Sequence, residues 1–190
     1  MEKPPLTYTF NPRPFGAGNV YTLREDGLGF ASGLRSRVLP YNEITSIRLA
    51  FAPKNFNAGG FSATVASGWR KVTIANVSWK GLMEQDTDNP GYRAFVSALV
   101  GEAVRANPSV VLAAGVSAWR YWGMVPLTAV MLGMLAWFCW RSLGQGVWPA
   151  ALIGLAMGAY LAWWSKRFIE RNRPGAFTAG NIPERVLPLA

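Results

Sequence analysis

The chain has 190 residues, 51% of them hydrophobic, and a formal net charge of +9 at pH 7. It contains no histidine and one cysteine, Cys139, which excludes histidine-based catalysis, histidine metal ligands and an intrachain disulfide. A positive charge of this size is typical of proteins that bind nucleic acid or anionic membranes. We expect no nucleic-acid binding, because no segment interleaves basic and aromatic residues and much of the excess charge adjoins two apolar stretches near the C-terminus.

Residues 1–18 contain several prolines and are predicted to form an extended arm. Short runs rich in β-branched and aromatic residues follow, separated by turn signals such as Asp26-Gly27 and Ser67-Gly68. Ile44 and Ile47 are out of phase for a single strand face, so we expect a bulge or a short lead-in there. The segment Ala52–Gly60 is expected to be a loop. The predicted strands are Val20–Arg24, Leu28–Ala31, Arg35–Leu39, Ile44–Leu49, Phe61–Ala66 and Arg70–Trp79.

One amphipathic helix is predicted after the strands. Asn89 is the expected N-cap, Pro90 suits the first helical position, and Asn107-Pro108 ends the helix. One face carries an apolar stripe at helical spacing. The stripe consists of Tyr92, Phe95, Val96, Leu99 and Ala103. A strand meander closed by one helix predicts an α+β domain, a small open β-barrel capped by that helix, over residues 19–107, with residues 108–118 as a linker.

Two apolar, aromatic-bracketed stretches follow, Tyr121–Trp140 and Val147–Ser165. A helix of about 20 residues is about 30 Å long, which matches the hydrocarbon core of a bilayer. Because only residues 141–146 lie between them, we predict a transmembrane helical hairpin over residues 119–165. Residues 166–190 form a basic, proline-punctuated tail.

Basic residues flank the outer ends of the predicted hairpin, whereas its turn carries Arg141 alone. Since lysine and arginine near a span stay on the cytoplasmic side, both termini are predicted to be cytoplasmic. The juxtamembrane basic residues are Arg120, Lys166, Arg167, Arg171 and Arg173.

Small residues recur every four positions in both predicted spans, which permits close approach of helices. They are Ala129 and Gly133 in the first span and Ala150, Gly154, Gly158 and Ala162 in the second. This face either joins the two helices of the hairpin or docks a separate membrane protein or a second copy of the chain. A transporter or channel is not expected, because neither span has an ionisable residue in its middle.

Three segments, Tyr21–Phe30, Leu39–Leu49 and Tyr92–Phe95, resemble the opening strands and the closing helix of bacterial pleckstrin-homology-like (PH-like) domains. The resemblance covers about residues 19–107. Bacterial members of this family are commonly fused to transmembrane helices, so the resemblance implies a multi-pass protein of the bacterial inner membrane.

PH domains that bind phosphoinositides surround the headgroup with basic residues, so the resemblance implies a ligand-binding role for basic residues of this chain. The candidates are Arg35, Arg37, Lys54, Arg70, Lys71 and Lys80. Arg35 and Arg37 with Arg70 and Lys71 form a phosphate pocket in one interpretation. In a second, the basic residues form a face against anionic lipid, and in a third they are simple surface charge. The first hairpin loop carries Glu25-Asp26, which would repel phosphate, so inositol-lipid specificity is not expected.

The acidic residues Glu84, Asp86 and Asp88 precede the helix. They are expected to be solvated and to favour the positive helix N-terminus; a divalent-cation site is the alternative. The C-terminal tail is either disordered or packs in extended form on this domain or on a partner. Its apolar anchors would be Phe177, Ile182, Val186, Leu187 and Leu189.

The sequence has no phosphate-binding loop, nucleophile elbow or dinucleotide-binding turn, so we expect no catalytic residues, metal, cofactor or enzymatic activity. The expected function is a non-catalytic, membrane-anchored accessory, scaffold or regulatory subunit of a larger membrane protein complex. The alternative is a stand-alone module that binds or senses anionic lipid at the cytoplasmic face.

Overall fold

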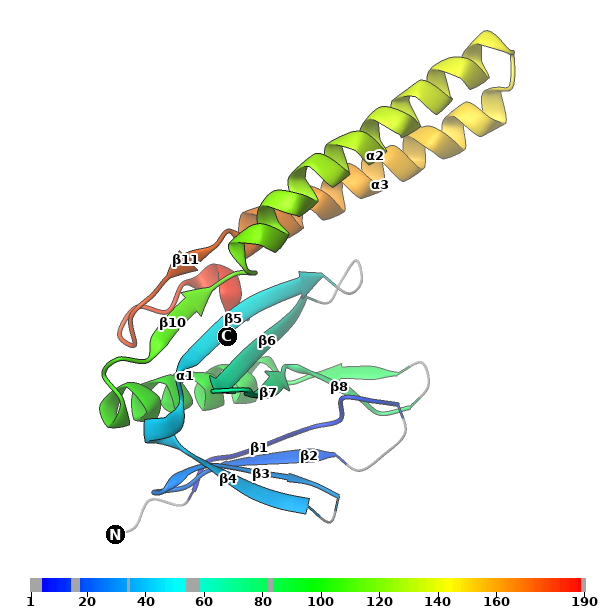
Figure 1. Ribbon diagram of the computed structural model, residues 1–190. Coiled ribbons are helices and arrows are strands. Elements are labelled where there is room, and N and C mark those ends of the chain that lie inside the picture. Colours follow the sequence, from blue (N-terminus) through cyan, green and yellow to red (C-terminus); the bar gives the residue numbers. More distant parts are fainter. Residues whose placement is uncertain (1–4, 15–17, 34, 54–58, 82–83, 189–190) are drawn as a thin grey trace. The chain divides into compact units, whose positions relative to one another are not determined.

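A computed structural model describes residues 5–14, 18–33, 35–53, 59–81 and 84–188 (Figure 1). The chain forms two compact units. Unit 1 combines Met1–Gly115 with Gly175–Ala190, and unit 2 is Val116–Pro174. The helical unit is therefore an insertion into the sequence of the mixed α+β unit.

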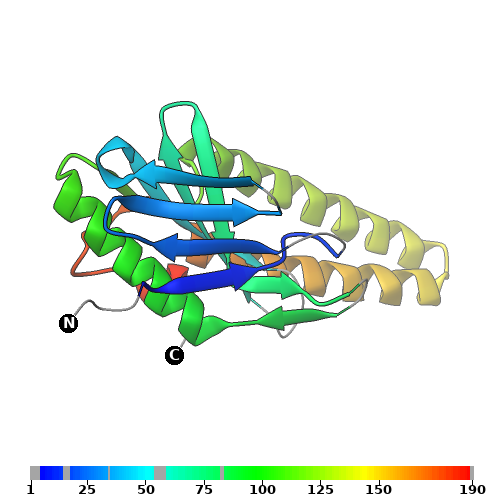
Figure 2. The same ribbon diagram turned by 90° about the horizontal axis from the view of Figure 1, so that it is seen from below.

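The first sheet of unit 1 has four antiparallel strands in chain order: β1 (Thr7–Phe10), β2 (Asn19–Leu23), β3 (Gly27–Ser32) and β4 (Arg35–Pro40). Figure 2 shows them side by side. Strand β1 lies within the segment expected to be an arm. Its alternate residues Tyr8 and Phe10 are buried, and Tyr8 pairs with Tyr21 of β2. The prediction of an extended arm over residues 1–18 is therefore corrected at Thr7–Phe10, which is a strand of the sheet. The sequence analysis missed this strand because its period-two apolar pattern is short and lies among prolines.

The second sheet has the order β11-β10-β5-β6-β7. Its central strands are β5 (Ser46–Pro53), β6 (Gly59–Ser67) and β7 (Arg70–Ala75). The expected lead-in is confirmed: Tyr41–Glu43 forms a 3-10 turn, η1, and Ile44 is buried before the strand begins. The loop predicted over Ala52–Gly60 is shorter than expected, because β5 and β6 remain paired as far as Pro53 and Gly59; residues 54–58 lie outside the described part of the chain.

The strand predicted over Arg70–Trp79 is divided at Asn76. Strand β7 ends at Ala75, and β8 (Val77–Trp79) pairs instead with β9 (Gln85–Thr87). The buried side chain of Asn76 accepts a hydrogen bond from the Phe61 amide at 2.7 Å and donates one to Asn89 Oδ1 at 2.8 Å. A polar side chain satisfied in this way holds the chain where it leaves the sheet.

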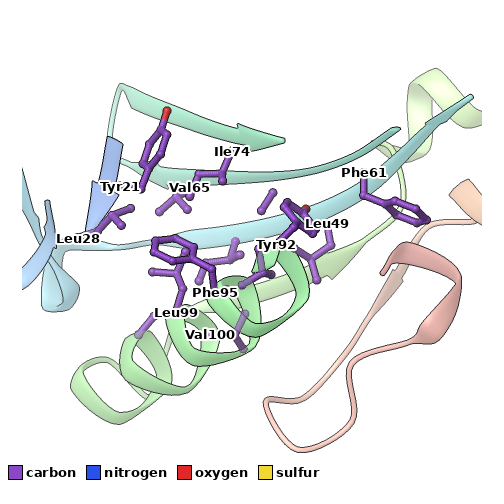
Figure 3. Close-up of a cluster of buried hydrophobic side chains, with 14 of the residues drawn as sticks. Tyr21, Leu28, Leu49, Phe61, Val65, Ile74, Tyr92, Phe95, Leu99 and Val100 are labelled. Carbon is purple, nitrogen blue, oxygen red and sulfur yellow. The ribbon is translucent and has the colours of Figure 1, made fainter. Parts of the chain in front are cut away.

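Helix α1 (Asn89–Ala106) follows, and its apolar stripe is buried as predicted. The N-cap is Asp88 rather than Asn89: its carboxylate accepts a hydrogen bond from the Gly91 amide at 2.8 Å. Figure 3 shows Tyr92 of α1 beside Leu49 of the second sheet, with Phe95 and Leu99 on the same side of the helix. Buried residues of both sheets and of α1 form one core.

Tyrosine hydroxyls from the first sheet reach the backbone of the second. Tyr8 donates a hydrogen bond to the Ala75 carbonyl at 2.9 Å, and Tyr21 donates one to the Thr73 carbonyl at 3.3 Å. Both acceptors lie on β7, the edge strand. Hydrogen bonds from tyrosine side chains of the first sheet to backbone carbonyl groups of β7 thus connect the two sheets along this edge.

The predicted linker and tail both contribute strands. β10 (Val111–Ala114) runs parallel to β5, and β11 (Gly175–Ala176) pairs antiparallel with β10. Beyond β11, the 3-10 turn η2 (Glu184–Val186) brings Val186 and Leu187 into the core, with Phe177 and Ile182 partly buried against it. The interpretation in which the tail packs on this domain is confirmed; Leu189 lies outside the described residues.

Unit 2 is an antiparallel pair of helices, α2 (Ala118–Gly144) and α3 (Trp148–Asn172). Among the helices of the described residues, α2 alone is long and apolar enough to cross a membrane. Helix α3 falls short because tryptophans, a tyrosine, a proline and glycines interrupt its aliphatic residues. The hairpin is therefore present as a pair of helices, and the crossing of a membrane by both of them stays a prediction.

Candidate functional site

Three of the basic residues selected from the sequence lie around one pocket of about 320 Å³ in unit 1. Arg37 comes from β4, and Arg70 and Lys71 come from the start of β7. β4 and β7 are edge strands of different sheets, so the pocket is a crease between two sheet edges. Its lining residues are Phe30, Arg37, Val38, Leu39, Trp69, Arg70, Lys71 and Val72.

The tight turn between β6 and β7 places an aromatic side chain at this pocket. Ser67 pairs with Arg70, so Gly68 and Trp69 are the two loop residues. Gly68 has φ +55°, a conformation that glycine adopts without strain. Trp69 is 85% exposed, and the Arg70 guanidinium lies 5.2 Å from its ring centroid. The sequence analysis predicted this turn but did not select Trp69; a two-residue loop after Ser67 would have placed it at the tip.

The electrostatic character of the crease is uniformly positive. Arg37, Arg70 and Lys71 are all exposed, and no carboxylate of the described residues forms an ion pair with any of them. Unpaired guanidinium and ammonium groups facing a common space attract phosphate or carboxylate, and arginine can bind either with two parallel hydrogen bonds.

A second, smaller hollow of about 160 Å³ adjoins the crease on the first sheet. It shares Phe30, Arg37 and Val38 with the crease and adds Arg24 at its far side. Arg24 lies close over Gly29, where an added Cβ would meet Arg24 Nε at 3.0 Å. Arg37 therefore borders both hollows, whereas Arg24 borders only the smaller one.

The remaining basic candidates are not at the pocket or fall outside the described residues. Lys54 and the side chain of Arg35 lie outside them. Lys80 forms an ion pair with Asp86 at 2.8 Å. Their mutual hydrogen bond raises the pKa of Lys80 and lowers that of Asp86; both groups are exposed, so this pair adds little stability. Lys80 is thus occupied by a carboxylate away from the crease.

Two of the three acidic residues before α1 have side-chain partners within the chain. Asp86 is held by Lys80, and Asp88 caps the helix. Within the described ranges, no group of three or more metal-ligating side chains comes together.

The basic residues predicted to be juxtamembrane lie at one end of the helix pair, where α2 begins and α3 ends. The Arg120 guanidinium lies 5.5 Å from the Trp119 ring, and that of Arg167 lies 5.3 Å from the Trp163 ring. Lys166 is 4.0 Å from Glu170, and Arg171 and Arg173 follow on the same end of the chain. Arg141 lies near the opposite end, in the last turn of α2.

The small residues of the two helices differ in their burial. Gly154 is buried in the helix–helix contact, where an added Cβ would meet Cys139 Sγ at 2.6 Å, and the Cys139 thiol donates to the Ala151 carbonyl at 3.6 Å. Gly158 is half-buried, yet an added Cβ there would meet nothing within 4 Å. Ala129, Gly133 and Ala162 are exposed, and Ala150 is half-buried.

No protein-family model, curated protein or solved structure matches this chain.

Proposed function

We propose that this chain is a non-catalytic, membrane-anchored PH-like module that acts as an accessory, scaffold or regulatory subunit of a larger membrane protein complex. The observation that carries the proposal is the apolar outer surface of the helix pair. Large exposed side chains cover both helices, far beyond what a water-soluble surface normally carries. They include Trp122, Leu127, Val130, Met131, Met134, Trp137, Leu152, Ile153, Leu155 and Met157.

The chain path supports the proposed hairpin topology. α2 follows β10, α3 precedes β11, and these two strands pair with each other. If α2 crosses the bilayer, α3 must return, because residues before and after the hairpin belong to the same folded unit. Both termini then lie on one side, and the basic residues at that end of the helices favour the cytoplasmic side of a bacterial inner membrane.

The strand order supports the PH-like part of the proposal. A four-stranded antiparallel meander, β1–β4, is followed by a three-stranded meander, β5–β7, and, after the β8–β9 hairpin, by the helix α1. Such folds are scaffolds that present loops and edges to ligands or proteins, and function lies in the site that each one carries. Strands β10 and β11 extend the second sheet and attach the helices to it.

A partner membrane protein is proposed to dock on the exposed small residues of α2. Ala129 and Gly133 lie outside the contact with α3, and an added Cβ at Gly133 would meet nothing within 4 Å of its own chain. Small residues allow another helix to approach closely in lipid. A second copy of the chain is the alternative occupant.

Mild-detergent purification followed by mass spectrometry tests the accessory role. We expect a membrane protein to co-purify with the wild-type chain and to be lost from Gly133→Leu. The control is Gly123→Leu on another face of α2, where an added Cβ also meets nothing, and this variant should retain the partner. A solitary monomer from the wild-type chain would contradict the accessory role, and a pure homo-oligomer would replace the heterologous partner by a second copy.

A stand-alone lipid-binding module is the second candidate. The observation that favours it is the unpaired basic crease with an exposed tryptophan at its rim.

A further inference from the structure

The crease lies at the margin of the core between the two sheets of unit 1. Along β4, Arg37 shares a face with the buried Leu39, because alternate residues of a strand lie on the same face. Along β7, Arg70 likewise shares a face with Val72 and the buried Ile74. Each sheet therefore brings the same pair to the crease: an arginine and, two positions on, an apolar residue on the core-facing side.

The edge of β4 at the crease has no strand beside it. β4 pairs with β3 and ends the first sheet. β7 ends the second sheet, but tyrosine hydroxyls already bind the carbonyl groups of Thr73 and Ala75. In the described part of the chain, β4 is thus the longer free edge at the crease, and a free edge can pair with a strand of another chain.

Charge decides which strand can pair there. Arg37, Arg70 and Lys71 line the crease, and none forms an ion pair with a described carboxylate. A second copy of the chain would bring the same positive edge, and like charges opposite each other on neighbouring strands are destabilising. A segment that carries carboxylates would be attracted, and a guanidinium can bind a carboxylate with two parallel hydrogen bonds.

The size of the pocket also favours a peptide. Its volume of about 320 Å³ is at the lower limit for a site that holds a drug-sized ligand or a cofactor. It suits one or two side chains of an extended segment whose backbone lies along β4.

We propose that an acidic, extended segment of a partner protein adds a strand to the free edge of β4 and places its carboxylates in the crease. This inference rests on the proposed role as an accessory subunit. Directly opposite residues on neighbouring strands lie on the same face, so the residue opposite Arg37 is acidic and the residue opposite Leu39 is apolar. Main-chain hydrogen bonds supply affinity, and this pair of side chains supplies specificity.

The strand register indicates which part of the partner supplies the segment. The β6–β7 turn lies beyond Ser46, where β5 begins, whereas the chain leaves β10 toward α2 opposite Leu49. The crease is thus bordered by the end of the second sheet away from the entry into α2. We expect the segment to come from a water-exposed part of the partner.

The test measures peptide binding to the full chain in phosphatidylcholine nanodiscs by fluorescence anisotropy. The probe is a capped, fluorescein-labelled octapeptide, Glu-Thr-Val-Thr-Glu-Thr-Val-Thr, which as a strand has glutamate and valine on one face. It should bind at least about tenfold more tightly than Glu-Val-Thr-Thr-Glu-Val-Thr-Thr, which has the same composition with glutamate and valine on opposite faces. Equal affinity of the two peptides would overturn the proposal.

Charge reversal tests the site from both sheets. Arg37→Glu and Arg70→Glu should each weaken binding of the first peptide by at least about tenfold, the effect of losing a charge-assisted hydrogen bond. Arg24→Glu is the matched control, because Arg24 borders only the smaller hollow; salt screens a charge outside the site, so this variant should change binding by less than about threefold. Circular dichroism verifies that all three variants are folded. An equal loss in Arg24→Glu would overturn the site.

Hydrogen exchange tests the added strand itself. Binding of the first peptide should slow the exchange of amides in β4, because their free edge becomes paired. Peptide binding with unchanged exchange in β4 would overturn strand addition.

The other outcomes are separated in the same system. Loss of peptide binding in discs that contain phosphatidylglycerol would assign the crease to lipid and overturn the proposal. A partner that co-purifies with the wild-type chain, which itself binds neither peptide, overturns the peptide site alone. A solitary monomer that binds the first peptide as expected overturns the accessory role and leaves the site.

Discussion

Leu187 tests whether the segment after the helices is part of the domain core. Its side chain is 3% exposed and belongs to the same buried cluster as Leu49 and Leu99. Leu187→Ala removes three buried carbon atoms, which at about 0.8 kcal/mol each is about 2.4 kcal/mol of transfer free energy. The cavity that remains raises the loss to about 2–5 kcal/mol. This is a large fraction of the roughly 5–15 kcal/mol by which a domain is normally stable.

Thermal unfolding of the full chain in detergent, followed by circular dichroism of the β-rich unit, measures this loss. At roughly 4 °C per kcal/mol, we expect the Tm of Leu187→Ala to fall by roughly 8–20 °C. Glu184→Ala in the same segment is the control, because this side chain is exposed and its loss should change stability by less than about 0.5 kcal/mol. An unchanged Tm for Leu187→Ala would refute the assignment of residues 175–188 to the core.

Two further predictions concern buried contacts. Tyr92→Phe should stabilise unit 1 by about 1 kcal/mol, because the Tyr92 hydroxyl is buried without a hydrogen-bond partner among the described residues. Tyr8→Phe should destabilise unit 1 by about 1 kcal/mol, because it removes the hydrogen bond to the Ala75 carbonyl. Thermal unfolding of both variants measures these opposite shifts in Tm, and equal shifts would contradict them. Gly154→Leu should separate the two helices and Gly158→Leu should not, because only a side chain at Gly154 meets the facing helix. Disulfide trapping or spin-label distances across the hairpin measure the separation of the helices. An equal response of both variants would contradict the observed contact.

The sequence predicted the elements whose signals are local. The stripe on α1 has five apolar residues at helical spacing, and the turn at Ser67-Gly68 lies between two alternating runs. Each pattern is long enough to exclude other structures. A bulge or a lead-in before β5 was also predictable, because Ile44 and Ile47 are out of phase for one strand face; the structure has the lead-in.

The elements that the sequence missed depend on contacts across long stretches of chain. β1, β10 and β11 have four, four and two residues, too few for a periodic signal. β10 becomes a strand because β5 offers a free edge, and β11 becomes one because the helices return the chain beside β10. Asn76 divides a continuous apolar run because its side chain binds backbone and side-chain groups that are distant in sequence.

The candidate site was predicted in part. Arg37, Arg70 and Lys71 were selected together for their charge, and the structure places them around one pocket. The sequence could not separate them from Lys80, because the pairing of Lys80 with Asp86 depends on β8 and β9 lying side by side. It also could not indicate that the pocket lies between edges of two different sheets.

The insertion of the helices between β10 and β11 has a consequence for biosynthesis. The residues that complete the second sheet and fill its core leave the ribosome only after both helices have been made. Until then, the edge of β10 and the apolar surface that later receives Val186 are uncovered in the nascent chain. Under the proposed membrane topology, insertion of the helices and completion of the domain are therefore coupled. A chain whose second helix fails to return to the side of unit 1 would expose an unfinished sheet that cellular proteases can recognise.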